Sequence, residues 1–202
     1  ESAFEVLDRV ERLKKQGRDI INLSIGQPDF LTSDNIVEAA VKALRDGVHG
    51  YTPAPGLVSL REAVSERYYE EFGMSIDPNN VLITPGAKPV LFIVASMLGG
   101  DGHEILYPDP GFPIYESVIK FSGAKAVSYP LLEKENFSIN TSMILDRITE
   151  KTRLLILNSP HNPTGSVSKQ KELEELIETL IDHPNIGILS DEIYSKMYFD
   201  DL

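Results

Sequence analysis

The sequence predicts an α/β fold in which a mainly parallel β-sheet lies between two layers of helices. Short apolar runs alternate along the chain with helical patterns of about 10–15 residues, which is typical of βαβ units. Several of these runs, such as Arg153–Leu157 and Ile186–Ser190, are apolar almost throughout. Strands of that kind are buried on both faces, so helices must cover each side of the sheet. We therefore expect three layers, α/β/α.

The first part of the chain predicts three amphipathic helices and two short strands. Each helix has apolar residues on one face and a glycine just after its last turn, at Gly17, Gly47 and Gly73. The expected elements, in order, are helix Ala3–Lys15, strand Ile20–Leu23, a helix capped within Thr32–Asp34 that extends to Ala43, helix Leu57–Phe72 and strand Val81–Thr84.

The rest of the chain alternates regularly between helix and strand. A helix that opens at Lys88 is apolar on nearly every side, so we expect it to be buried all round. Ser142 is expected to cap a short helix. The expected elements are helix Lys88–Leu98, strand Glu104–Tyr107, a helix from Pro113 to about Ser122, strand Ala126–Tyr129, helix Ile144–Ile148, strand Arg153–Leu157, helix Lys169–Ile181 and strand Ile186–Ser190.

Composition excludes several classes of function. The 202 residues include 19 basic and 31 acidic side chains, a formal net charge of -12, and no local basic patch, so nucleic acid is not an expected partner. No apolar run approaches ~18 residues, so no membrane span is expected. There is no cysteine, and the four histidines lack i, i+4 pairing, so we expect no metal site. No signal peptide is visible, which makes the cytoplasm the default location, although the chain begins at Glu1.

Polar residues with possible chemistry follow the predicted strands, at the edge where open α/β sheets bind ligands. Gly86–Lys88 opens a helix, where backbone N–H groups suit a phosphate, although glycine there can equally serve tight packing. Asn162 precedes Pro163, which holds it extended with its amide free to point outward. The same Asn-Pro and Thr-Gly pairs also occur in plain turns.

Three further residues belong to this edge. Phe112 lies on a turn between Gly111 and Pro113, where an aromatic ring can cover a ligand or simply close the core. Asp191 follows a buried strand, so its carboxylate needs a partner such as a cationic heterocycle, unless it only caps the next turn. Tyr194 stands three residues later and can bond the same ligand or pack in the core.

Taken together, these segments resemble one family over essentially the whole chain: the fold-type I, pyridoxal-phosphate-dependent aminotransferases of classes I and II, of the aspartate or aromatic type. Each segment alone is a weak signal, but five occur in the family's order and spacing. They are Gly26–Phe30, Tyr51–Pro53 with Gly56, Leu60–Ala63, Asn162–Gly165 and Asp191–Tyr194.

The resemblance implies a role for each matching residue. Asp191 pairs with the pyridine nitrogen of pyridoxal 5'-phosphate, Asn162 and Tyr194 bond the ring hydroxyl, and Asn162 also lies at the substrate. The remaining assignments place Phe112 on the ring face, Ala87 and Lys88 on the phosphate, Tyr51 on the phosphate of a neighbouring subunit's cofactor and Gly26 beside the substrate carboxylate. Sharing of sites implies a homodimer. The substrates implied are an L-amino acid and a 2-oxo acid.

The family's Schiff-base lysine lies downstream of the segment that matches Asp191–Tyr194. We therefore expect it beyond Leu202, with no catalytic lysine in this chain, which we expect to be a fragment that is inactive alone. The resemblance implies that residues 1–45 contribute to a small domain and its link, and that residues 46–202 form an incomplete large cofactor domain. A carbon–sulfur lyase or ring-forming synthase would share every motif, and a cofactor-sensing regulator would share the fold.

Overall fold

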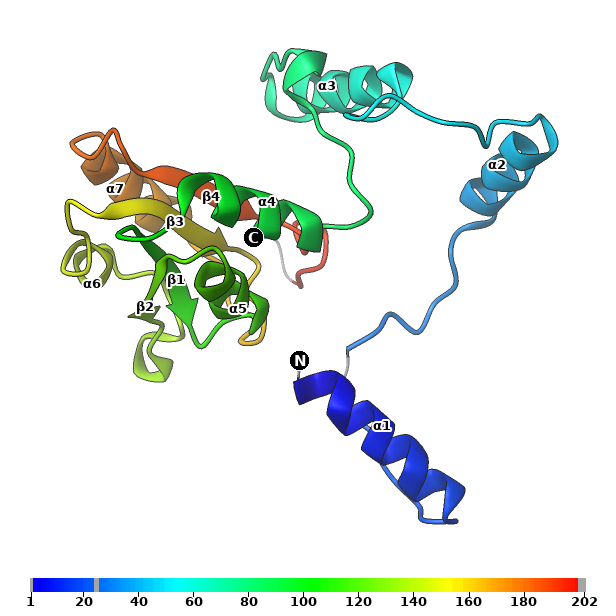
Figure 1. Ribbon diagram of the computed structural model, residues 1–202, viewed down its shortest axis with the longest axis horizontal. Coiled ribbons are helices and arrows are strands. Elements are labelled where there is room, and N and C mark those ends of the chain that lie inside the picture. Colours follow the sequence, from blue (N-terminus) through cyan, green and yellow to red (C-terminus); the bar gives the residue numbers. More distant parts are fainter. Residues whose placement is uncertain (1, 24–25, 200–202) are drawn as a thin grey trace. The chain divides into compact units, whose positions relative to one another are not determined.

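The computed structural model describes residues 2–23 and 26–199 (Figure 1). The chain divides into two compact units, residues 1–84 and residues 85–202. Among the described helices, none combines the length and apolarity needed to cross a bilayer.

The first unit is helical. Its elements are α1 (Ser2–Lys15), α2 (Asp34–Arg45), α3 (Val58–Phe72) and the short 3-10 helix η1 (Pro78–Asn80). The predicted helices are therefore confirmed, and α3 ends as expected at Gly73, which adopts a left-handed backbone with φ 66°. Arg61 of α3 is buried and its Nη1 donates a 3.1 Å hydrogen bond to the carbonyl oxygen of Pro78.

Two strands predicted in this unit are absent. Ile20–Leu23 and Val81–Thr84 are neither helix nor strand, and Ile21 and Leu23 are almost fully exposed. A strand requires a hydrogen-bonded neighbour, and within the described residues neither segment pairs with another strand. Their apolar pattern alone was not sufficient to predict a strand.

The second unit is the predicted α/β/α sandwich. All four strands are parallel, in the order β2-β1-β3-β4. The elements are α4 (Lys88–Leu98), β1 (Glu104–Asp109), α5 (Ile114–Phe121), β2 (Lys125–Pro130), the 3-10 helix η2 (Glu133–Glu135), α6 (Thr141–Leu145), β3 (Thr152–Asn158), α7 (Gln170–Leu180) and β4 (Gly187–Asp191).

Alternate side chains of the strands build two separate cores, because successive residues of a strand point to opposite faces. Ile105 of β1 packs with residues of α4 and α5, whereas its neighbour Leu106 packs with residues of α6 and α7. In β3, Ile156 belongs to the first core and Leu157 to the second. The helix pairs therefore cover opposite faces of the sheet, as Figure 1 shows.

Two predictions in this unit need correction. α4 is not buried on all sides: Leu91 and Ala95 are buried, but Met97 is 75% exposed within the described residues. The short helix α6 begins at Thr141, earlier than expected. Its N-cap is Asn140 and not Ser142, because Asn140 Oδ1 accepts a hydrogen bond from the backbone N–H of Met143.

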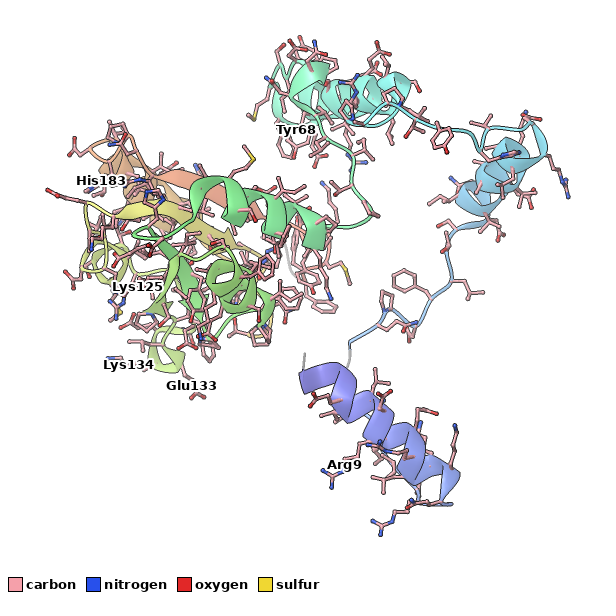
Figure 2. The ribbon with its side chains drawn as sticks, viewed as in Figure 1. Arg9, Tyr68, Lys125, Glu133, Lys134 and His183 are labelled. Atoms are coloured by element: carbon pink, nitrogen blue, oxygen red, sulfur yellow. The ribbon has the colours of Figure 1, made fainter. Side chains whose placement is uncertain are left out.

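The amino-terminal edge of the sheet is held by a buried carboxylate. Glu104 begins β1 and accepts hydrogen bonds from Lys125 of β2 at 2.8 Å and from Thr149 at 2.7 Å. Both bonds lower the pKa of Glu104, and the bond from Lys125 has the larger effect. Lys125 lies at the start of β2 (Figure 2). The cluster connects β1, β2 and the turn before β3 at the end of the sheet opposite to the carboxyl edge.

Strand order places a switch point at the carboxyl edge. From β1 the chain crosses to β2 on one side and later returns to form β3 on the other side. The loops after β1 and β3 therefore leave the sheet in different directions and open a crevice between them, the usual place for a ligand in such sheets.

Candidate functional site at the carboxyl edge of the sheet

A cavity of about 190 Å³ occupies this crevice. Its lining mixes aliphatic and aromatic side chains with a few polar groups, the usual composition of a small-molecule site. The lining residues are Ala87, Lys88, Leu91, Phe112, Tyr115, Asn158, Asn162, Asp191, Ile193 and Tyr194. All six candidate residues predicted from the sequence within residues 85–202 are among them.

Asp191 is the last residue of β4 and supplies the carboxylate of the cavity. Oδ2 of Asp191 accepts a 2.7 Å hydrogen bond from the hydroxyl of Tyr115, a fully buried residue of α5. Burial raises the pKa of Tyr115 most, and the hydrogen bond to Asp191 raises it further. The phenol therefore keeps its proton and remains a donor. A neutral donor orients the carboxylate without cancelling its negative charge.

Phe112 lies in the loop after β1 and is half-buried against the core under α4 and α5. The edge of its ring meets Tyr115 in a T-shaped contact, with ring centroids 5.8 Å apart. The ammonium of Lys88 lies 5.9 Å from the ring centroid, within the range of a cation–π interaction. Gly111 permits this loop, because a Cβ at that position would lie 2.2 Å from the carbonyl oxygen of Pro108.

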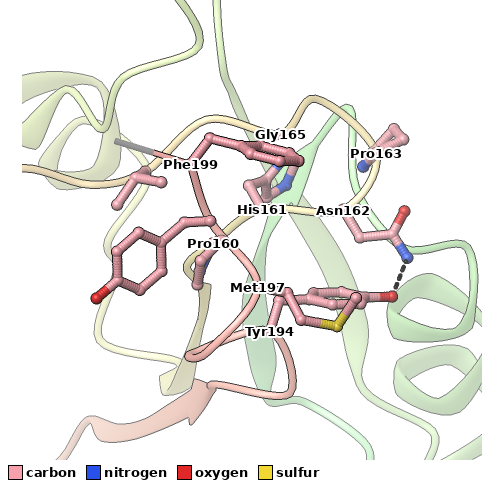
Figure 3. A pocket seen from close by; sticks show the side chains of 10 residues that line it. Pro160, His161, Asn162, Pro163, Gly165, Tyr194, Met197 and Phe199 are labelled. Carbon is pink, nitrogen blue, oxygen red and sulfur yellow. Dashed lines mark hydrogen bonds between the residues drawn. The ribbon is translucent and has the colours of Figure 1, made fainter. Parts of the chain in front are cut away.

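Asn162 and Tyr194 meet from two different loops. Nδ2 of Asn162 donates a 3.2 Å hydrogen bond to the hydroxyl oxygen of Tyr194, so the amide is not free as predicted (Figure 3). The turn that carries Asn162 is closed on both sides by backbone hydrogen bonds, from His161 to Ser166 and from Gly165 to His161, each 2.8 Å long. The loops after β3 and β4 therefore present one polar pair to the cavity.

The start of α4 supplies the opposite end of the cavity. Ala87 is the N-cap of α4, and both Ala87 and Lys88 line the cavity. The amino-terminal end of a helix carries a partial positive charge, so this end of the cavity favours an anion. The cavity thus places a carboxylate, an aromatic ring, an amide–phenol pair and a positive helix end around one small volume.

Figure 3 shows a second, larger cavity, of about 470 Å³. Asn162 and Tyr194 line both cavities. His161 also lines it and is only 5% exposed; Nδ1 lies 2.8 Å from Oγ1 of Thr164. Nε2 of His161 is buried and has no hydrogen-bond partner among the described residues. Burial lowers the pKa of His161, so the ring is neutral.

Four lining residues were not identified as candidates from the sequence: the apolar Leu91 and Ile193, and the polar Tyr115 and Asn158. No local pattern marks Tyr115, because its bond to Asp191 spans 76 residues. Asn158 is a polar residue at the end of an otherwise apolar strand, a signal that could have identified it.

The other two predicted residues belong to the first unit. No heavy atom lies within 4 Å of the position that a Cβ on Gly26 would take, among the described residues, and Tyr51 is fully exposed. Their roles stay predictions.

Within residues 2–23 and 26–199, no group of three or more histidine, aspartate or glutamate side chains is placed to hold a metal ion.

A family profile described as aminotransferase class I and II matches residues 18–202. The chain belongs to that family. Aspartate aminotransferase of Pyrococcus horikoshii is 40% identical over 197 residues, which are 98% of this chain and 49% of the relative. A probable aspartate/prephenate aminotransferase of Aquifex aeolicus is 35% identical over 193 residues, 96% of this chain and 49% of the relative. The chain spans about half the length of the curated relatives it matches.

Solved aminotransferase structures share the fold. Alanine aminotransferase from Pyrococcus furiosus superposes with a TM-score of 0.93 at 33% identity, over 98% of this chain and 51% of that one. Aspartate aminotransferase from Thermus thermophilus with maleate gives a TM-score of 0.89 at 32% identity, over 94% of this chain and 50% of that one. The resemblance inferred from five short segments is thus confirmed at the level of family and fold.

Proposed function

We propose that the complete protein is an aminotransferase that moves an amino group between an L-amino acid and a 2-oxo acid, using pyridoxal 5'-phosphate bound in the smaller cavity. The observation that carries this proposal is Asp191: a carboxylate oriented by a neutral phenol, beside an aromatic ring, in a chain of the aminotransferase family. The relatives named above, which are aspartate, aspartate/prephenate and alanine aminotransferases, support the reaction class.

The lining residues fit this cofactor by their chemistry. Pyridoxal phosphate is a flat heterocycle with a basic nitrogen, a neighbouring hydroxyl and a phosphate. A carboxylate suits the nitrogen, the Asn162–Tyr194 pair suits the hydroxyl, and the start of α4 suits the phosphate. Phe112 supplies an apolar face against which a flat ring can stack.

When bound, the cofactor supplies an electron sink that acidifies the α-hydrogen of the amino acid. Asp191 holds a proton on the ring nitrogen, because its negative charge stabilises the pyridinium form. Asn162 and Tyr194 hold the ring hydroxyl oxygen, and Ala87 and Lys88 hold the phosphate, chiefly through backbone amides. The lysine that carries the cofactor and moves the proton at Cα remains a prediction for the sequence downstream of Leu202.

Residues of the first unit complete the proposed site. We infer that Gly26 leaves room for the substrate carboxylate and that Tyr51 reaches the cofactor phosphate of a neighbouring subunit, which requires a two-fold homodimer. Residues 1–45 are proposed to contribute to a small domain, and residues 46–202 to the large cofactor domain. These assignments rest on the resemblance alone, and the dimer is testable by light scattering. The cytoplasm is proposed only as the default location.

The decisive experiment uses the complete protein loaded with pyridoxal phosphate and a panel of amino acids. We expect aspartate, glutamate, alanine or an aromatic amino acid, together with a 2-oxo acid, to give the exchanged pair of products in equal amounts. Release of pyruvate with ammonia or a sulfide instead indicates the carbon–sulfur lyase. Failure to bind the cofactor at all would exclude the enzyme proposal.

A further inference from the structure

Asn158 is the residue at which the loop after β3 and the end of β4 meet beside the smaller cavity. It ends β3, is 5% exposed, and lies directly beside Asp191 in the parallel register of β3 and β4. A buried carboxamide must satisfy its hydrogen-bonding groups within the protein, because leaving them unpaired is costly.

The Asn158 amide is satisfied by backbone groups of the loop after β3 and of the end of β4. Nδ2 donates to the carbonyl oxygen of Asp191 at 2.8 Å and to that of Pro160 at 3.2 Å. Oδ1 accepts the backbone N–H of Asn162 at 2.9 Å. Two carbonyls can only accept and an N–H can only donate, so the orientation of the amide is determined by its partners.

We propose that Asn158 is a positioning residue that fixes the backbone of Asn162 and of Asp191 relative to one another. Asn162 and Asp191 lie 29 positions apart in sequence, the first in the loop after β3 and the second at the end of β4. One side chain bonds the main chain of both. The side chains assigned above to the ring hydroxyl and to the ring nitrogen of pyridoxal phosphate thereby keep a constant separation. This inference rests on the proposed function.

The residue type matters for this role. Leucine has the same branched arrangement of side-chain heavy atoms but neither donates nor accepts, so Asn158→Leu would leave the Asn162 N–H and the Asp191 carbonyl without this partner. Alanine removes the same bonds and leaves space for water. A matched control lies at the other end of the same strand, where buried Thr152 accepts a 3.0 Å hydrogen bond from the N–H of Thr149. Thr152→Val removes that bond far from the cavity.

The test measures cofactor affinity in the complete apoprotein, with three probes. They are pyridoxal phosphate, an analogue with carbon in place of the ring nitrogen, and an analogue without the ring hydroxyl. The preference of the wild-type protein for the natural cofactor over the analogue without the ring nitrogen reports the contact with Asp191. Its preference over the analogue without the ring hydroxyl reports the contact with Asn162. Melting temperature of the apoprotein reports stability alone.

We expect Asn158→Leu to reduce both preferences by roughly three- to tenfold, the range that the loss of one or two hydrogen bonds predicts. Thr152→Val should lower the melting temperature and leave both preferences within about twofold of wild type. If Asn158→Leu does not fold, Asn158→Ala is expected to give the same pattern. Unchanged preferences in either folded variant would overturn the positioning role.

The proposed function can fail separately. If wild type does not bind pyridoxal phosphate, or binds all three probes equally well, the roles assigned to Asp191 and Asn162 are wrong, and the inference about Asn158 is wrong with them. If the wild-type protein and the Asn158→Leu variant prefer pyridoxal phosphate over the analogues to the same extent, only the inference about Asn158 is wrong.

Discussion

The hydroxyl of Tyr115 donates a hydrogen bond to Oδ2 of Asp191 over 2.7 Å, joining the helix after β1 to the last residue of β4. Both residues line the smaller cavity. The phenol holds one oxygen of the carboxylate, and Oδ1 lies 3.4 Å from the backbone N of Ile193. The orientation of the carboxylate is therefore set by the protein before any ligand binds.

Tyr115→Phe removes this bond and keeps the ring. Because a hydrogen bond to a charged group contributes about 1.5–3 kcal/mol, we expect the Kd of pyridoxal phosphate to rise roughly tenfold or more in the complete protein. Tyr129→Phe is the matched control: Tyr129 is equally buried, but its hydroxyl donates to the carbonyl of Ile156 in the core that faces α6 and α7. That variant should lose stability and keep its affinity. Equal affinities for both variants would contradict the role of Tyr115.

Asp191→Asn tests the charge itself. The amide is nearly isosteric but cannot stabilise a protonated ring nitrogen, so we expect turnover to fall by roughly 10²–10³-fold, as for the loss of one preorganised electrostatic contact. Glu192→Gln changes the neighbouring, exposed carboxylate, which accepts a hydrogen bond from the hydroxyl of Ser190. Turnover of that variant should match wild type. An active Asp191→Asn enzyme would disprove the assignment.

Gly111→Ala tests the loop that carries Phe112. The new Cβ would lie 2.2 Å from the carbonyl oxygen of Pro108, a backbone atom, so the loop and its aromatic ring must shift. We expect a loss of about 1–3 kcal/mol in stability together with weaker cofactor binding. Gly102→Ala is the control, since Gly102 has φ 82° and no described atom within 4 Å of the added Cβ. It should cost stability without changing the affinity measured by titration.

His161 predicts a pH dependence of stability. Burial lowers its pKa below the ordinary value of 6.5, so the unfolded chain binds a proton at pH values where the folded protein does not. The stabilisation is complete above the unfolded-state pKa and is lost as the pH falls toward the folded-state pKa. For one group the slope is at most about 1.4 kcal/mol per pH unit.

His161→Asn keeps a polar atom near Thr164 and removes the titrating ring. Chemical denaturation at mildly acidic and mildly alkaline pH should show a smaller difference in the free energy of unfolding for this variant than for wild type. An identical difference in both proteins would mean that His161 does not titrate on unfolding.

The sequence was most informative where a pattern is local. Helix periodicity, glycine stops and apolar strand runs predicted the order of elements in residues 85–202. The position of Phe112, Asn162 and Asp191 just after predicted strands predicted these three residues as neighbours. Failures came from partners that no local pattern specifies. Val81–Thr84 has the composition of a strand but pairs with none among the described residues.

The same reason explains the missed lining residues. Tyr115 and Asn158 act through bonds to residues 76 and 33 positions away, respectively, and the pattern around each residue looks like an ordinary helix or strand. Such contacts depend on strand order and register, which periodicity does not determine.

Asn158 and Asp191 form the last pair of the β3–β4 ladder. Because side chains alternate along a strand, inserting or deleting one residue inside β4 would bring Ser190 or Glu192, respectively, to that place. Every side chain between the change and the end of the strand would then point to the opposite face. No substitution in the cavity could repair such a change. Related sequences should therefore tolerate variation of length in the connection at 181–186, between α7 and β4, and keep the length of β4 constant.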